Sequence, residues 1–270
     1  MLPAIVLATA ALAAATPQPV TLVFCAPGYP GSTKEAQPNM DALAKAVSAA
    51  AGPPALPVAA EYYETEDAGV ARLKSARGSL AVVPLPFFLS HAGALKLAAV
   101  AQAVEKDGQA AVTWTLVAKK GRVSSPADLA GFTIVSIAAY APDFIKNVAL
   151  EAWGALPADV KFQTNGQVLS ALRRAGSGEN VAVLLDAAQA ASLPTLPFAA
   201  DLAVVATSPP LPGIVVCTVG ATPKSAESAR IVGALLKVDQ TPEGRAALDA
   251  VRLSKFVPAD AKAIAAARAR

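Results

Sequence analysis

The chain has 270 residues, of which 54% are hydrophobic and 16% charged, so it is long enough to bury one large core or two modest ones. A net charge of +3 and an aromatic content of 5% indicate neither a nucleic-acid-binding surface nor a base-stacking platform. Composition therefore excludes a disordered chain and a nucleic-acid partner, and it favours a small-molecule partner. After the N-terminus, no uninterrupted apolar run reaches the roughly 18 residues that a spanning helix needs.

The first 15 residues, MLPAIVLATAALAAA, are typical of a signal peptide. Ala13 and Ala15 occupy the small-residue positions of a cleavage site, which predicts a mature chain that begins near Thr16. No Lys or Arg precedes the apolar run, so a buried or anchoring first helix is the alternative. We expect an exported, periplasmic protein.

The cysteine and histidine content limits the chemistry. Cys25 and Cys217 each lie in an apolar run, which excludes a disulfide framework and a cysteine-based zinc site. One bridge between them stays possible, although two buried thiols are favoured. His91 is the sole histidine, which excludes a metal site made of several imidazoles. We therefore expect neither a metal nor a cofactor.

From Val20 onward, short β-branched runs alternate with amphipathic stretches, which predicts βαβ units and a mainly parallel sheet. The third strand should run on into Pro84–Phe88, with His91 in a short turn. The expected elements of the first half are strands over 22–26, 56–60 and 80–83, helices ending at Gly52 and over 67–76, and extended segments over 95–104 and 110–118.

The pattern then restarts, beginning with a short helix capped by Ser125. A second set follows, with strands over 133–137, 160–163 and 181–185 and helices over 143–153 and 167–174. After the proline-rich stretch 208–213, one strand over 214–219 should precede only helices, over 225–238, 242–251 and 259–268. Such an ending is too small for a third domain, so we expect the chain to return to the first lobe.

The predicted fold class is thus α/β, with two doubly wound lobes joined by two hinge crossings. We assign residues 1–15 to the signal peptide, 16–113 and 213–270 to the first lobe, and 114–212 to the second. The crossings lie near 110–118 and 208–213, and a rigid hinge there should let a ligand bring the lobes together.

The order of motifs resembles the periplasmic solute-binding proteins of ABC importers, in the PhnD-like phosphate/phosphonate-binding branch of the type II fold. The resemblance rests on APGYPGSTKEAQPNMDAL, LAVVPLPFFL, SSPADLAG, VAVLLDAAQA, ATSPPLPGIVVCTV and TPEGRAAL to FVPAD, in that order along nearly the whole mature chain. It implies a monomeric binder, without catalysis, that delivers a small molecule to an ABC-type permease.

One loop of the chain differs from that of the phosphonate-binding members. Phosphonate-binding members carry a Ser-Thr-Ser-Gly-like loop after the first strand of the second lobe, whereas this chain has SIAAYAPD over 136–143. The hydroxyl cluster is gone and Asp143 would repel an anion. We therefore expect a ligand more apolar than a phosphonate, lipid-like or aromatic, with phosphate or phosphonate binding as the alternative.

Nine residues are candidate ligand contacts, eight because they lie where strands end at the expected cleft, and Trp114 because it lies near the first crossing. Ser32 and Thr33 follow a glycine-bearing loop, and Asp186 follows an apolar strand at a position that faces the cleft in the family layout. The structural alternatives are a turn capped by Ser32, core positions for Phe87 and Phe88, and a helix cap for Asp186. The nine are Tyr29, Ser32, Thr33, Tyr62, Phe87, Phe88, Trp114, Tyr140 and Asp186.

Two other classes of function stay open. An enzyme could reuse the fold, with His91 or Asp186 as acid or base, although no GxSxG elbow or dinucleotide fingerprint is present. A sensory or scaffold subunit could instead bind another protein through its closed form.

Overall fold

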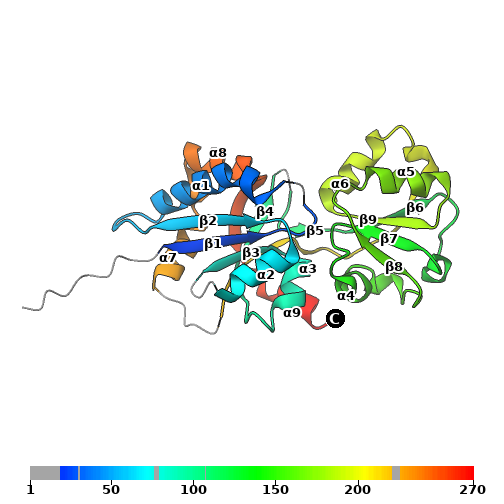
Figure 1. Ribbon diagram of the computed structural model, residues 1–270, viewed down its shortest axis with the longest axis horizontal. Helices are drawn as coiled ribbons and strands as arrows, with labels where there is room; N and C mark the ends of the chain where they lie inside the picture. Colours follow the sequence, from blue (N-terminus) through cyan, green and yellow to red (C-terminus); the bar gives the residue numbers. More distant parts are fainter. Residues whose placement is uncertain (1–18, 30, 76–78, 107, 221–225) are drawn as a thin grey trace, which may run out of the picture.

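The computed structural model describes residues 19–29, 31–75, 79–106, 108–220 and 226–270. Two α/β lobes lie side by side along the long axis of the molecule, and two extended segments run between them (Figure 1). The expected signal peptide lies outside the described residues. Among these residues, no helix is long and apolar enough to cross a membrane.

A six-stranded sheet forms the centre of the first lobe. Strands β1, β2 and β3 are parallel, whereas β12 and β13 run antiparallel to β3 and β4. Every residue of β1 and β3 is buried, as expected for strands covered on both faces. In sheet order the strands are β13 (Leu253–Pro258), β4 (Ala98–Glu105), β12 (Ile214–Thr218), β3 (Leu80–Pro84), β1 (Val20–Cys25) and β2 (Val58–Tyr63).

Helices cover both faces of this sheet. Met40, Ile231 and Leu248 pack from three helices onto one face, and Leu73, Phe87 and Ile264 pack from three others onto the opposite face. The first group is α1 (Thr33–Ala50), α7 (Ala226–Leu235) and α8 (Pro242–Ala250), and the second is α2 (Glu66–Ser75), α3 (Leu85–His91) and α9 (Ala261–Arg268).

A five-stranded sheet forms the second lobe. Its order is β10 (Leu202–Thr207), β6 (Thr115–Lys119), β9 (Val181–Leu185), β7 (Thr133–Ser136) and β8 (Lys161–Thr164). The helices are α4 (Pro142–Phe144), which continues as a π-helical turn over Ile145–Ala149 and a 3₁₀ turn over Glu151–Trp153, α5 (Leu169–Ser177) and α6 (Ala187–Ser192); a further 3₁₀ turn covers Pro126–Leu129.

The two crossings between the lobes are hydrogen-bonded to each other. Strand β5 (Ala111–Val112) pairs antiparallel with β11 (Leu211–Pro212). Next to them, the Trp114 N–H donates to the Ser208 hydroxyl at 2.9 Å, and the Ser208 N–H donates to the Trp114 carbonyl at 2.8 Å. The crossings therefore form one two-stranded ribbon.

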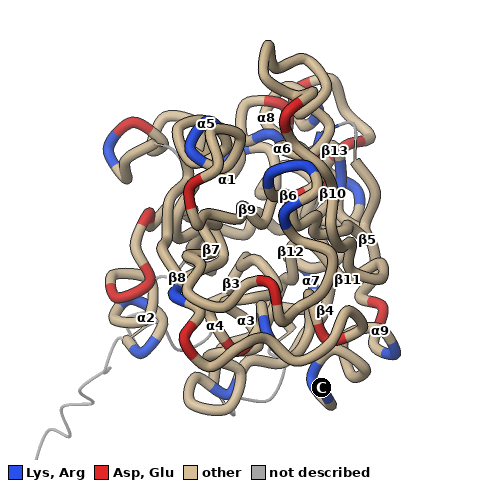
Figure 2. Tube along the Cα trace, turned by 90° about the vertical axis from the view of Figure 1, so that its right-hand side faces the viewer, with Lys and Arg blue, Asp and Glu red and all other residues tan. Residues whose placement is uncertain are grey.

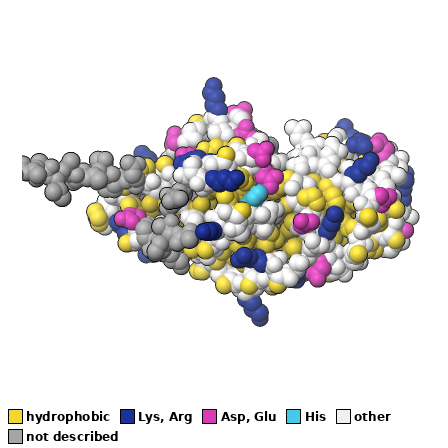
Figure 3. Space-filling model, turned by 60° about the horizontal axis from the view of Figure 1, so that its bottom comes forward, with side chains coloured by type: hydrophobic (Ala, Val, Ile, Leu, Met, Phe, Trp, Pro, Cys, Tyr) yellow, Lys and Arg dark blue, Asp and Glu magenta, His cyan; other side chains and the backbone are white. Residues whose placement is uncertain are grey.

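One hydrophobic core continues from the first lobe into the second. It contains Phe87 and Phe88 from α3 together with Ile137 and Phe144 from the second lobe. The Trp114 ring meets the Phe144 ring edge-on, with 5.3 Å between centroids. In the space-filling view, hydrophobic side chains also reach the surface on both lobes (Figure 3). The lobes are thus in direct apolar contact.

Three sequence expectations need correction. The segment after β3 is helix α3, because Pro86 lies in its first turn, where a proline costs no hydrogen bond. The region after 214–219 contains a strand, β13, which pairs with β4 at the sheet edge. The helix expected over 143–153 is divided into three short helical turns of different type.

The cysteines are free and buried. Strand β3 lies between the strands that carry Cys25 and Cys217. Neighbouring strands are about 4.8 Å apart, so the two residues are too far apart for a disulfide. The preferred interpretation, two buried thiols, is confirmed. Burial raises the pKa of the Cys25 thiol to about 12, which makes it a poor nucleophile.

Charged residues of both signs are interspersed along the chain trace (Figure 2). Within the described part of the chain, no group of three or more His, Cys, Asp or Glu residues could hold a metal ion.

Candidate functional site

A small cavity lies where the two sheets and the two crossings meet. Its volume is about 20 Å³, enough for about one water molecule. Both lobes and both crossings contribute to its wall. The lining residues are Tyr29, Pro84, Glu105, Val112, Trp114, Asp186, Ala187, Gly213 and Ile214.

The cavity is small because the lobes touch beside it. Gly28 has a φ of 83°, and a Cβ there would lie 2.8 Å from the Ile137 carbonyl oxygen of the second lobe. A Cβ on Gly166 would lie 2.0 Å from the Gly28 carbonyl oxygen. Backbone meets backbone only because both positions are glycine. The structure is therefore that of a closed form.

Two carboxyl groups from different lobes face this cavity. Glu105 ends β4, and Asp186 follows β9 as the N-cap of α6, where it accepts a hydrogen bond from the Gln189 N–H at 2.7 Å. Burial, and then the negative charge of Asp186, raise the pKa of Glu105. Burial also raises the pKa of Asp186, against the opposing effect of its N-cap hydrogen bonds.

The Glu105 carboxylate lacks a hydrogen-bond or ion-pair partner among the described residues. None of the described Lys or Arg residues contributes to the pKa shift of Glu105 or Asp186. The cavity thus contains two carboxyl groups that no described Lys or Arg compensates.

Two aromatic side chains complete the wall. Tyr29 lies in the loop between β1 and α1, and Trp114 lies just before β6. Burial, followed by the charges of Asp186 and Glu105, raises the pKa of Tyr29 well above its usual range. The Tyr29 hydroxyl has no hydrogen-bond partner in the described part of the chain. It is a free polar group beside the two carboxyl groups.

Ser32 and Thr33 lie at the start of α1, outside the cavity wall. The Ser32 side chain caps the helix and forms a capping box with Glu35. The Thr33 N–H and hydroxyl both donate to the Glu64 carboxylate, at 2.6 and 2.7 Å. In this form the donors at the start of α1 are therefore occupied by the protein's own carboxylates, which lowers the pKa of both acids.

The loop after β7 also directs few donors into the cavity. Its Ser136 hydroxyl is buried and accepts a hydrogen bond from the Ala138 N–H at 3.1 Å. The buried Tyr140 hydroxyl lacks a hydrogen-bond partner in the described structure. Burial, and then the nearby Tyr29 phenol, raise the pKa of Tyr140 well above its usual range, and the Phe87 N–H opposes this shift without reaching hydrogen-bond geometry.

The remaining candidates lie away from the cavity. Phe87 and Phe88 are fully buried in the core that continues into the second lobe, and neither lines the cavity. The His91 ring contacts the Phe87 ring in a tilted arrangement, and its Nε2 lies 2.7 Å from a Glu66 oxygen; Figure 3 shows the histidine beside acidic side chains. Tyr62, on edge strand β2, does not line the cavity, and burial raises its pKa to about 12.

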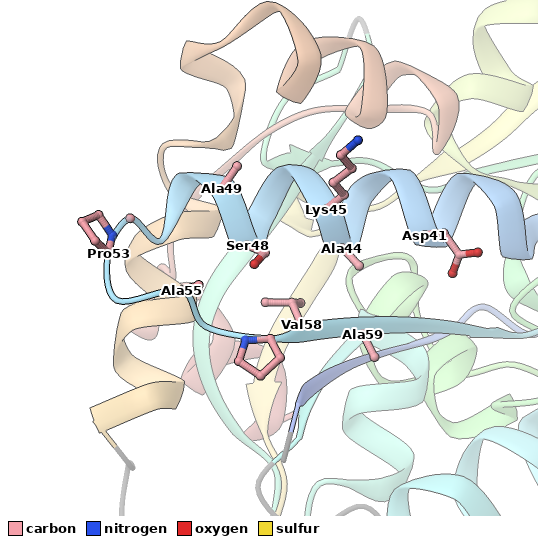
Figure 4. Close-up of a pocket in the computed structure, with 11 residues that line it drawn as sticks. Asp41, Ala44, Lys45, Ser48, Ala49, Pro53, Ala55, Val58 and Ala59 are labelled. Carbon is pink, nitrogen blue, oxygen red and sulfur yellow. The ribbon is translucent and has the colours of Figure 1, made fainter. Parts of the chain in front are cut away.

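A larger, open depression lies between α1 and β2 (Figure 4). It measures about 800 Å³ and is lined mainly by small side chains such as Ala44 and Ala49. It includes the amino-terminal end of β2, whereas ligands of parallel α/β sheets bind at the carboxyl ends of the strands. We therefore place the functional site at the small cavity.

Sequence reasoning missed Glu105. The available signal was a charged residue that ends the apolar run AAVAQAV shortly before the first crossing. Three of the predicted contacts, Tyr29, Trp114 and Asp186, lie together with Glu105 in the wall of the cavity.

Comparison with solved structures shows that the fold is shared. XAC2383 from Xanthomonas citri, bound to ATP, matches with a TM-score of 0.71 and 13% identity over 93% of this chain and 96% of that one. PhnD1 from Prochlorococcus marinus, in complex with methylphosphonate, matches with a TM-score of 0.63 and 14% identity over 92% of this chain and 95% of that one. PA3383 from Pseudomonas aeruginosa, a binding protein component of an ABC phosphonate transporter, matches with a TM-score of 0.60 and 17% identity over 93% of this chain and 85% of that one.

The fold is accordingly the two-lobed type II periplasmic-binding-protein architecture expected from the sequence. A comparison with curated protein sequences finds no match. The model of one protein family, described as "ABC transporter, phosphonate, periplasmic substrate-binding protein", matches residues 31–264. Because this match spans most of the chain, the protein belongs to the family of periplasmic substrate-binding proteins of phosphonate ABC transporters.

Proposed function

We propose that the chain is exported, captures a small molecule between its lobes as a monomer, and delivers it unchanged to an ABC-type permease. The observation that supports this most is the small cavity whose wall is shared by both lobes and both crossings. A ligand held there contacts both lobes at once, so its binding energy stabilises the closed form over the open one.

The nature of the lining argues against an oxyanion. A phosphate-like ligand needs several N–H and O–H donors and no carboxylate nearby. Here the donors of Ser32 and Thr33 are engaged by Glu35 and Glu64, and two carboxyl groups line the cavity. The proposed ligand therefore lacks a phosphate or phosphonate group.

The cavity wall contains fewer apolar side chains than we expected from the sequence. Phe87 and Phe88 belong to the core, so they do not enlarge the apolar wall in the closed form. Trp114 and Tyr29 still offer aromatic surface to a ligand. An aromatic contact to a small organic molecule fits this wall better than a lipid chain does.

A phosphonate is the second candidate, because the family model is described by that ligand and PhnD1 is solved with methylphosphonate. An enzymatic role has less support, since His91 is paired with Glu66 and lies outside the cavity wall.

Native mass spectrometry of protein purified from its own host tests the proposal. We expect a retained small molecule that is released unchanged on denaturation. Refolded, ligand-free protein should become more compact in small-angle scattering when that molecule is added back. Gly233→Ala changes a half-buried position of helix α7, where a new Cβ meets no atom within 4 Å, and it is the control variant taken through the same purification and refolding. A chemically altered molecule, or no compaction at saturation, would contradict the proposal.

A further inference from the structure

We propose that the cleft takes a small organic cation, an amine or quaternary ammonium, whose charge lies between Glu105 and Asp186 against the rings of Tyr29 and Trp114. The inference rests on the proposed function, because it assigns a ligand class to the same cavity. Three features of the cavity support it, namely its charge, its aromatic wall and its unpartnered polar groups.

The charge argument concerns what closure does to the two carboxyl groups. Glu105 comes from the larger sheet and Asp186 from the smaller one, so closing the lobes brings them to one cavity and takes them from water. Burial without a partner disfavours the ionised form of a carboxyl group. Since no described Lys or Arg compensates them, a positive charge brought by the ligand would restore favourable ionisation.

The aromatic wall fits the same chemistry. Tyr29 and Trp114 line the cavity together with the carboxyl groups. The face of an indole or phenol ring attracts a cation, and the attraction strengthens when the cation is desolvated. Two rings beside two carboxylates favour an ammonium group over a neutral molecule of the same shape.

The hydrogen-bonding capacity of the wall is also unused. The Glu105 carboxylate can only accept when ionised, and the Tyr29 hydroxyl is free to accept as well. An ammonium group offers only donors. The second Asp186 oxygen adds a further acceptor, since the N-cap bond to the Gln189 N–H uses Oδ1.

The size of the cavity sets how the ligand enters. A volume of about 20 Å³ accommodates a group the size of ammonium. A larger cation such as choline requires the lobes to part slightly along the Gly28 to Ile137 contact. The headgroup would then lie in the cavity while the rest of the molecule lies between the lobes.

Calorimetry on the full mature chain tests the inference with three kinds of probe. The cations are methylammonium and choline, the neutral probe is 3,3-dimethylbutan-1-ol, which has the shape of choline without its charge, and the anions are phosphate and methylphosphonate. We expect a cation to bind at least tenfold more tightly than the neutral probe. We expect no binding of the anions.

Two isosteric variants connect binding to the carboxyl groups. Glu105→Gln, and Asp186→Asn, which retains an N-cap acceptor, should each weaken cation binding at least tenfold. Glu243→Gln and Asp159→Asn remove exposed carboxylates outside the cavity wall and should leave it unchanged. Circular dichroism confirms that each variant is folded.

The alternatives have distinct outcomes. Tight binding of methylphosphonate or phosphate without cation binding would overturn the inference and leave the proposed function intact. Equal binding of choline and its neutral analogue would overturn the role of charge. If no probe binds, the molecule released from host-purified protein decides: a cation supports the inference and a neutral molecule or an anion overturns it. The absence of any retained molecule would count against the proposed function, and the inference would fail with it.

Discussion

The carboxylates at the start of α1 and the carboxyl groups between the lobes differ in their hydrogen bonding and in the direction of their pKa shifts. Glu64 accepts two hydrogen bonds from Thr33, and these bonds lower its pKa. Glu105 accepts none from the described residues, and burial raises its pKa. The hydrogen bonds from Thr33 stabilise the ionised form of Glu64, whereas burial without a partner destabilises the ionised form of Glu105. The hydrogen-bonded Glu64 thus has a structural role, whereas the unpartnered Glu105 lies in the cavity where we propose that the ligand binds.

A variant that keeps the lobes apart should remove the difference between Glu64 and Glu105, and it should have the largest effect on ligand binding. In Gly166→Ala the new Cβ would overlap the Gly28 carbonyl oxygen across the cleft. We expect a larger radius of gyration by small-angle scattering and more than tenfold weaker choline binding. The pKa of Glu105 should fall toward its ordinary value, because opening returns it to water, and carbon-detected NMR titration measures this shift.

Gly233→Ala provides the control for that experiment, because its added methyl group meets no atom within 4 Å. An unchanged radius of gyration in Gly166→Ala, with an unchanged Glu105 titration, would show that the closed contact does not control the carboxyl pair.

Removing one charge from each region sharpens the comparison at pH 7. Glu64→Gln weakens two charge-assisted hydrogen bonds at the start of α1, so it should lower the free energy of unfolding by roughly 0.5–1 kcal/mol. Glu105→Gln removes an unpaired buried charge and should leave that free energy unchanged or raise it. Urea unfolding of both variants checks this. Equal losses in the two variants would contradict the division into satisfied and unsatisfied carboxylates.

The two sites should also respond oppositely to pH, with a smaller effect. The pKa of Glu105 is raised above 4.5, so its contribution to stability is greatest below that pH and is lost as pH rises through the folded-state pKa. The pKa of Glu64 is lowered from 4.5, so its contribution is present above that pH and is lost as pH falls.

Urea unfolding at pH 4 and pH 8 measures both trends. From pH 4 to pH 8 the wild type should lose stability relative to Glu105→Gln and gain it relative to Glu64→Gln. Parallel trends for the two variants would refute the assignment.

The smallest expected effect concerns a surface ion pair between the lobes. Arg270 Nε lies 3.5 Å from the Glu151 carboxylate, and the Glu151 side chain is 53% exposed. Exposed ion pairs contribute little, so Arg270→Ala should change the free energy of unfolding by less than about 0.5 kcal/mol. A larger loss in urea unfolding, abolished in 1 M NaCl, would show that this pair helps to hold the lobes together.

The fold was predictable to the extent that single segments determine it. The apolar run VAVLL followed by Asp186 predicts strand, end and helix cap, and the structure has all three. Strand β13 was missed because LSKFVP follows a helical pattern and becomes a strand only by pairing with β4. Helix α3 was missed because Pro84 and Pro86 indicate an extended segment unless the chain context makes them the start of a helix.

The candidate site was less predictable for the same reason. Strand ends indicated Tyr29 and Asp186, and closeness to the first crossing indicated Trp114. The role of Glu105 depends on the position of Asp186, 81 residues later in the chain, and on the closeness of the two lobes. Conversely, Phe87 and Phe88 carry no local sign that their rings turn into the core, because that depends on how α3 packs against the second lobe.

The position of β12 in the larger sheet determines the order in which the chain can fold as it is made. The smaller sheet needs only residues 115–207, so all its strands exist before β12 is synthesised. The larger sheet has its β4 separated from β3 until β12 arrives between them, and β13 comes later still. The half of the protein that is begun first is therefore the half that is completed last, which keeps the chain incompletely folded until its synthesis is nearly finished.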